Sequence, residues 1–189
     1  PIVLFLGQVT ERKGVDILLD AIARLDSDVN CQVWIGGRGA EAYRDRLDEQ
    51  IQRDGLENVS FLGWIPEEAM FAQYQAADIY VLPSRADPWP LSVVEAMKAG
   101  TPVVVSDAVG TGWDLVDGQE TGYVFPTEDA DELAARLEQL LRDPEQRSAM
   151  GDRAANLVRT HVTYDRMERQ ICEAIHRAAG GGAPRNSTI

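Results

Sequence analysis

Residues Arg85 to Val105 read RADPWPLSVVEAMKAGTPVVV, and this stretch decides how the rest of the chain is interpreted. Short apolar runs at 79–82 and 103–105 predict two buried strands, and a helix that begins near Pro90 joins them. In a parallel sheet such a helix starts at the carboxyl edge of the strands, where free backbone N–H groups and the helix dipole favour anions. The stretch therefore predicts a site for a phosphate-bearing ligand at the start of this helix.

Two acidic residues of the stretch, Asp87 and Glu95, are candidates for binding. General acid–base catalysis and a metal site are possible uses of such a pair. A carboxylate also accepts hydrogen bonds from two neighbouring hydroxyls, as a nucleotide ribose presents them. The apolar neighbours of Glu95 are typical of a largely buried helix, where an unpaired carboxylate is costly. We therefore expect Glu95 to hold a ribose and Asp87 to lie near the group attached to the phosphate.

Strand and helix patterns alternate along the rest of the chain. Further strands are predicted at 2–6, 31–35, 59–62 and 123–125, and helices at 14–25, 40–53, from Pro66, at 130–141, from Pro144 and at 164–178. Short connections between them indicate right-handed βαβ units. The sequence thus predicts an α/β fold with a doubly wound parallel six-stranded sheet and helices on both faces. We expect one domain over 1–179 and a flexible tail over 180–189.

The loops that follow the strands carry the remaining chemistry, because ligands bind at that edge of a doubly wound sheet. Lys13 lies in GQVTERKG (7–14), where its charge can neutralise a phosphate; a solvated lysine in a strand-to-helix turn is the alternative. Arg38 lies in GGRG (36–39), which is a tight turn or assists a nucleotide. Neither loop matches the Walker or the dinucleotide pattern, which disfavours a dinucleotide-dependent oxidoreductase.

Composition excludes several partners. The 189 residues carry a net charge of −13, which argues against general nucleic-acid binding and against adhesion to anionic membranes. No apolar run approaches the roughly 18 residues of a membrane span, and no signal peptide is visible. Cys31 and Cys172 belong to no CxxC pair and are typical of reduced thiols, so we expect a cytoplasmic protein. Asp129-Ala130-Asp131 is interpreted as a helix start and not as a metal motif.

Together these residues resemble the C-terminal domain of retaining glycosyltransferases of the GT-B fold, family 4. The resemblance covers residues 2 to 178. It rests on FLGQVTERKGVDILLDAIARL (5–25), on NVSFLGWIPEEAMFAQYQAADIYVLPS (58–84) and on ADPWPLSVVEAMKAGTPVVVSDAVG (86–110), with its two acidic residues separated by seven. DLVDGQETGYVFP (114–126) and the two helices after it agree as well. The resemblance implies a Rossmann-like half of a GT-B fold.

In this family a sugar moves from a nucleotide diphosphate to an acceptor with retained anomeric configuration. The resemblance implies that Lys13 and Asp87 are catalytic, with Lys13 on the donor diphosphate and Asp87 facing the donor sugar. It implies a donor site of the UDP, GDP or ADP type, in which Glu95 holds the ribose, Trp64 and Ile65 border the base and Gly7 allows close approach. The expected substrate-binding residues are Gly7, Gln8, Lys13, Arg38, Trp64, Ile65, Asp87, Leu91, Ser92 and Glu95. No metal or cofactor is expected.

Three positions depart from the family pattern. Gln8 stands where an arginine usually partners the lysine, Asp87 replaces a glutamate, and Pro90 replaces a glycine. Because the arginine is absent, a non-catalytic domain that binds a nucleotide or a partner stays an alternative. A sugar-nucleotide epimerase is a further alternative, disfavoured by the GQVTERKG opening and the Asp87–Glu95 spacing.

The resemblance implies an acceptor site on a separate N-terminal domain, which we expect to be absent from this sequence. We therefore expect the chain alone to bind nucleotide weakly and to catalyse nothing. Polysaccharide or cell-envelope glycan synthesis is the expected setting.

Overall fold

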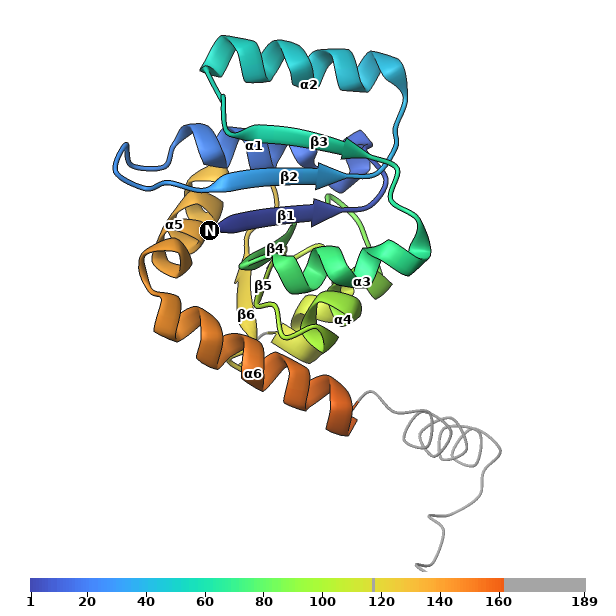
Figure 1. Cartoon of the computed structure of the whole chain (residues 1–189), viewed down its shortest axis with the longest axis vertical. Helices are drawn as coiled ribbons and strands as arrows, with labels where there is room; N and C mark the ends of the chain where they lie inside the picture. Colours follow the sequence, from blue (N-terminus) through green and yellow to red (C-terminus); the bar gives the residue numbers. More distant parts are fainter. Residues whose placement is uncertain (117, 162–189) are drawn as a thin grey trace, which may run out of the picture.

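The computed structural model describes residues 1–116 and 118–161. Within them six parallel strands form one sheet in the order β3-β2-β1-β4-β5-β6 (Figure 1). The strands are β1 (Ile2–Leu6), β2 (Gln32–Gly36), β3 (Val59–Gly63), β4 (Ile79–Leu82), β5 (Val103–Ser106) and β6 (Gly122–Phe125). Every residue of β4 and β5 is buried, as expected for central strands covered on both faces.

Helices cover both faces of the sheet. On one face α1 (Val15–Ala23) packs against α2 (Glu41–Asp54) and α5 (Ala130–Arg142). On the other, α4 (Leu91–Lys98) packs against α3 (Glu67–Ala76) and α6 (Pro144–His161) (Figure 1). Two short turns, η1 (Glu11–Lys13) and the π-helical η2 (Gly112–Val116), follow β1 and β5. The predicted α/β class, six-stranded sheet and two helical layers are confirmed.

Helix starts follow the capping residues. Asp129 Oδ1 accepts a hydrogen bond from the Glu132 N–H at 2.9 Å, and Asp143 Oδ1 accepts one from the Gln146 N–H at 2.8 Å. The interpretation of Asp129-Ala130-Asp131 as a helix start is therefore confirmed, as is the start of a helix at Pro144.

Some predicted boundaries were wrong by small amounts. Pro66 was expected inside its helix but is the N-cap residue of α3, with an extended backbone. The helix predicted at 14–25 is α1 (Val15–Ala23) with Gly14 as its N-cap residue, and the short turn η1 before it was not predicted. On α5, Leu140 is fully buried and Leu141 is partly buried. The helix predicted at 164–178 and the tail at 180–189 lie outside the described residues.

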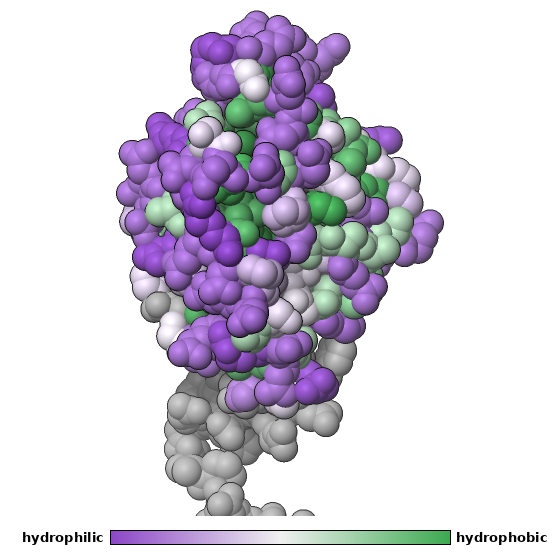
Figure 2. All heavy atoms as spheres, turned by 60° about the vertical axis from the view of Figure 1, so that its left-hand side comes forward, coloured by the Kyte–Doolittle hydropathy of each residue, from purple (hydrophilic) through white to green (hydrophobic). Residues whose placement is uncertain are grey.

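The surface agrees with the acidic composition. Figure 2 shows one face of the molecule, on which hydrophilic side chains cover most of the area and hydrophobic ones form small separate areas. Among residues 1–116 and 118–161, no helix combines the length and the apolar character that a bilayer crossing requires.

Candidate functional site

The strand order reverses between β1 and β4, and this switch point is where doubly wound sheets bind ligands. The loops that leave these two strands bring Lys13 and Asp87 together. Lys13 Nζ and a carboxylate oxygen of Asp87 form an ion pair, with side chains only 12% and 10% exposed. The two predicted catalytic residues therefore lie in contact, at the edge of the sheet where a ligand was predicted.

A close backbone contact fixes the position of Lys13. The next residue, Gly14, has a φ of +70°, and a Cβ built on it would lie 2.0 Å from the carbonyl oxygen of Pro83. Only glycine allows the loop after β1 to pass so near the end of β4. This contact lets the ammonium of Lys13 reach Asp87 across the switch point.

Arg85 connects the same two loops. Its guanidinium donates to both carboxylate oxygens of Asp16, at 2.9 and 2.7 Å, and to Glu128 at 2.5 and 3.0 Å. Its backbone N–H donates to the Arg12 carbonyl at 2.8 Å, and Arg12 in turn donates to the Ala86 carbonyl at 2.7 Å. Burial alone would raise the pKa of the Asp16 carboxyl, but hydrogen bonds from Arg85 and Tyr43 hold that pKa below its ordinary value. This cluster holds the loop that carries Asp87 against the loop that carries Lys13.

Replacing Asp16 by asparagine is expected to lower the free energy of unfolding by about 1 to 2 kcal/mol at pH 7, because charge-assisted hydrogen bonds are lost from a partly exposed cluster. The pKa of Asp16 is lower in the folded chain than in the unfolded one. The stabilisation is therefore complete above about pH 4 and is lost as the pH falls through the folded pKa. Urea unfolding of both proteins at pH 7 and pH 3 should show the difference shrink in acid.

A matched control is Asp48→Asn, which removes the carboxylate of an exposed pair with Arg44, one turn away on α2. This change should have little effect at either pH. An Asp16→Asn difference that stays the same at pH 3 would contradict the role given to the ionised carboxylate.

Helix α4 begins at Leu91 beside this pair. Its N-cap residue, Pro90, has no side-chain hydrogen bond to the first turn, so the N–H groups of Leu91 and Ser92 have no partner within the helix. Leu91 is 67% exposed. On the next turn, one carboxylate oxygen of Glu95 accepts a hydrogen bond from the Tyr74 hydroxyl at 3.1 Å. The protein itself thus supplies one hydrogen-bond donor to this carboxylate.

A second group of predicted residues gathers where β2 and β3 end. The Arg38 guanidinium lies 5.4 Å from the centre of the Trp64 ring, and the side chain of Ile65 covers Gly36. The Gly7 N–H donates to the Gly36 carbonyl at 3.0 Å, which joins this group to the loop after β1. Trp64 is 61% exposed, so its ring offers an open aromatic surface.

The predicted residues thus form two groups along one edge of the sheet. Lys13, Asp87 and the start of α4 form the first, and Arg38, Trp64 and Ile65 form the second. Gln8 is exposed in the loop between them. Sequence reasoning missed Arg85 and Tyr74, whose partners come from other elements. The only signal for Tyr74 was its place among the apolar residues of a predicted helix.

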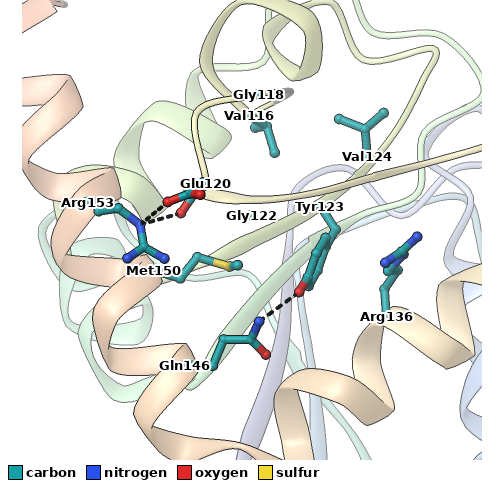
Figure 3. Close-up of a pocket in the computed structure, with 10 residues that line it drawn as sticks. All are labelled: Val116, Gly118, Glu120, Gly122, Tyr123, Val124, Arg136, Gln146, Met150 and Arg153. Atoms are coloured by element: carbon teal, nitrogen blue, oxygen red, sulfur yellow. Dashed lines mark hydrogen bonds and ion pairs between the residues drawn. The ribbon is translucent and has the colours of Figure 1, made fainter.

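A cavity of about 500 Å³ lies elsewhere, beside the end strand β6 (Figure 3). Arg153 Nε donates to the Glu120 carbonyl at 2.9 Å, and Gln146 Nε2 donates to the Tyr123 hydroxyl at 3.0 Å (Figure 3). Arg136 is paired with Glu132 at 2.6 Å and lies 4.9 Å from the Tyr123 ring. These polar groups are bonded to one another, so we interpret the cavity as a gap left where α5 and α6 pack against β6 and not as a ligand site.

The fold and the switch-point geometry define a Rossmann-like domain with a site at the carboxyl edge of its sheet. A sequence model of the family described as Glycosyl transferases group 1 matches residues 1–157. The chain therefore belongs to this family, and its sheet is the C-terminal domain of the GT-B fold.

Individual relatives agree with this assignment. The chain is 36% identical over 161 residues to D-inositol 3-phosphate glycosyltransferase of Corynebacterium aurimucosum, covering 82% of this chain and 38% of that protein. It is 38% identical over 187 residues to phosphatidyl-myo-inositol mannosyltransferase of Mycobacterium leprae, covering 96% and 48%. The crystal structure of Anabaena HepE in complex with UDP and glucose matches with a TM-score of 0.82 and 26% identity, covering 93% and 48%. The chain thus spans less than half the length of these relatives.

Proposed function

We propose that this chain is the donor-binding domain of a retaining, family 4 glycosyltransferase that takes its sugar from a nucleotide diphosphate. The observation that carries the proposal is the Lys13–Asp87 pair beside the uncapped start of α4, at the switch point of the sheet. An ammonium and free N–H groups are what a departing diphosphate requires. That the related HepE was solved with UDP and glucose supports a donor of this class.

The proposed roles follow the geometry. Lys13 and the N–H groups of Leu91 and Ser92 stabilise the diphosphate as it leaves, and Asp87 faces the sugar. Glu95 accepts hydrogen bonds from the ribose hydroxyls. The exposed face of Trp64, with Arg38 and Ile65 beside it, borders the base. In this proposal the cationic side chain and the helix start supply the charge that a metal ion supplies in other transferases.

We further propose that the acceptor is held by an N-terminal domain of the same protein, across a cleft from this one. In support, the chain spans less than half of its relatives. The phosphatidyl-myo-inositol mannosyltransferase among them favours polysaccharide or cell-envelope glycan synthesis. The free thiol of buried Cys31 fits a cytoplasmic location.

Calorimetric titration of the 189-residue chain with UDP, GDP and ADP tests the proposal. We expect one of the three to bind with a Kd on the order of 0.1 to 1 mM, because only part of the site is present. Glu95→Ala should weaken that binding, since the ribose hydroxyls lose their acceptor. No binding of any of the three at millimolar concentration would contradict donor binding.

A non-catalytic binding domain is the second candidate. Two observations favour it: Gln8 supplies no positive charge, and the charge of Lys13 is already neutralised by Asp87. A domain of this kind would bind the diphosphate no better than the nucleoside alone. The titration therefore includes uridine, guanosine and adenosine, and tighter binding of the diphosphate favours the transferase.

A further inference from the structure

Glu95, the residue proposed to bind the ribose, accepts a hydrogen bond from the hydroxyl of Tyr74. The roles proposed above do not include Tyr74. It lies on α3, and its side chain is completely buried. Its hydroxyl donates to Glu95 Oε2 at 3.1 Å, although the two residues are 21 positions apart and on different helices. Burial raises the pKa of the Tyr74 hydroxyl, so this group remains a donor at any physiological pH.

Tyr74 is held in place both at its ring and at its backbone. It packs edge-on against Tyr80 of β4, with ring centres 5.6 Å apart and planes at 72°. The backbone carbonyl of Tyr74 accepts a hydrogen bond from Thr101 Oγ1 at 2.7 Å. Tyr80 is itself fixed, because its hydroxyl donates to the carbonyl of Leu6, the last residue of β1, at 3.2 Å. The Tyr74 hydroxyl that donates to Glu95 is therefore held in place through contacts with the central strands β4 and β1.

Glu95 differs from its partner because it is only partly buried. Among residues 1–116 and 118–161, the Tyr74 hydroxyl is the hydrogen-bond donor to its carboxylate, and Oε1 receives none. Oε2 is thus bonded to the protein, and Oε1 is available to a ligand. A free glutamate side chain loses rotamer entropy when it is fixed, and anchoring before binding removes much of that cost from the binding step.

We infer that Tyr74 is a positioning residue that orients the Glu95 carboxylate to receive the vicinal hydroxyls of the donor ribose. The inference rests on the proposed function, because it requires that Glu95 binds a ribose. The role needs only the hydroxyl of Tyr74; the ring contributes packing. Tyr74→Phe removes the hydroxyl and keeps the ring.

The test uses the 189-residue chain and two probes: whichever of UDP, GDP and ADP binds best, and its 2′,3′-dideoxy counterpart. We expect Tyr74→Phe to weaken binding of the ribonucleotide about 5- to 10-fold and to leave binding of the dideoxynucleotide unchanged. The readout is the ratio of the two affinities. Because both are measured on the same protein, a reduced folded fraction cancels from this ratio, and a loss of packing alone does not change it.

Tyr123→Phe is the matched control. The Tyr123 hydroxyl also has a protein partner, Gln146, but Tyr123 belongs to β6, the end strand of the sheet (Figure 3). This variant should keep the wild-type ratio. If the wild type prefers the ribonucleotide and Tyr74→Phe prefers it equally, the positioning role is wrong and the ribose site stands. If the wild type itself shows no preference, Glu95 holds no ribose, and both the ribose role of Glu95 and the positioning role of Tyr74 are wrong.

Discussion

Replacing Gly14 by alanine is expected to lower the free energy of unfolding by about 3 kcal/mol or more. Two costs combine. A side chain at a φ of +70° costs about 1 kcal/mol, and the new Cβ would lie 2.0 Å from the Pro83 carbonyl oxygen, so the backbone at the switch point must separate. Urea unfolding measures the loss. Nucleotide binding should fall with it, because Lys13 moves away from Asp87.

Gly55→Ala separates the two costs. Gly55, at the end of α2, has nearly the same φ of +66°, yet a Cβ there meets no atom within 4 Å. Its replacement should cost only about 1 kcal/mol and leave nucleotide binding unchanged. Equal losses for the two variants would show that the contact with Pro83 is not what makes Gly14 necessary.

Lys13→Ala is expected to weaken nucleoside diphosphate binding about 30- to 100-fold, the largest effect on binding that we predict. The loss has two sources. The ammonium no longer meets the diphosphate, and the carboxylate of Asp87, only 10% exposed, is left without its partner in the same place. The double variant Lys13→Ala/Asp87→Asn should recover part of the affinity, about tenfold, because the repulsion is removed.

Lys98→Ala is the control, because Lys98 is the other lysine of the sequence and is exposed at the far end of α4. Calorimetry should show its affinity for the diphosphate within about twofold of the wild type. Binding of the corresponding nucleoside should be the same in all these proteins. A Lys13→Ala variant that binds the diphosphate as the wild type does would exclude Lys13 from the site.

The fold was largely predictable because its central strands, β1, β4 and β5, are buried on both faces. A strand of that kind appears as a continuous apolar run, and those at 2–6 and 79–82 were placed at their observed bounds. The left-handed backbone conformation of Gly14 was not predicted. It depends on the Pro83 carbonyl, which sequence periodicity does not place near residue 14.

The candidate site was predictable in its location but not in its internal contacts. The loops after parallel strands must meet at one edge, so Lys13 and Asp87 were placed in the same region. Their ion pair, the contacts of Arg85 with Asp16 and Glu128, and the bond from Tyr74 to Glu95 all depend on tertiary packing. Side-chain partners on different elements leave no periodic signal in a sequence.

The Lys13–Asp87 pair joins residues 74 positions apart, from strands on either side of the switch point. The half of the sheet formed by β1, β2 and β3 carries Lys13, and the half formed by β4, β5 and β6 carries Asp87. During synthesis on the ribosome, the growing polypeptide has no anion site until β4 and the loop after it have emerged and docked beside β1. Bringing residues 13 and 87 together also has an entropic cost of loop closure. We therefore expect the ion pair to form late in folding. Ligand affinity in this domain is consequently a reporter of complete folding, lost when either half detaches.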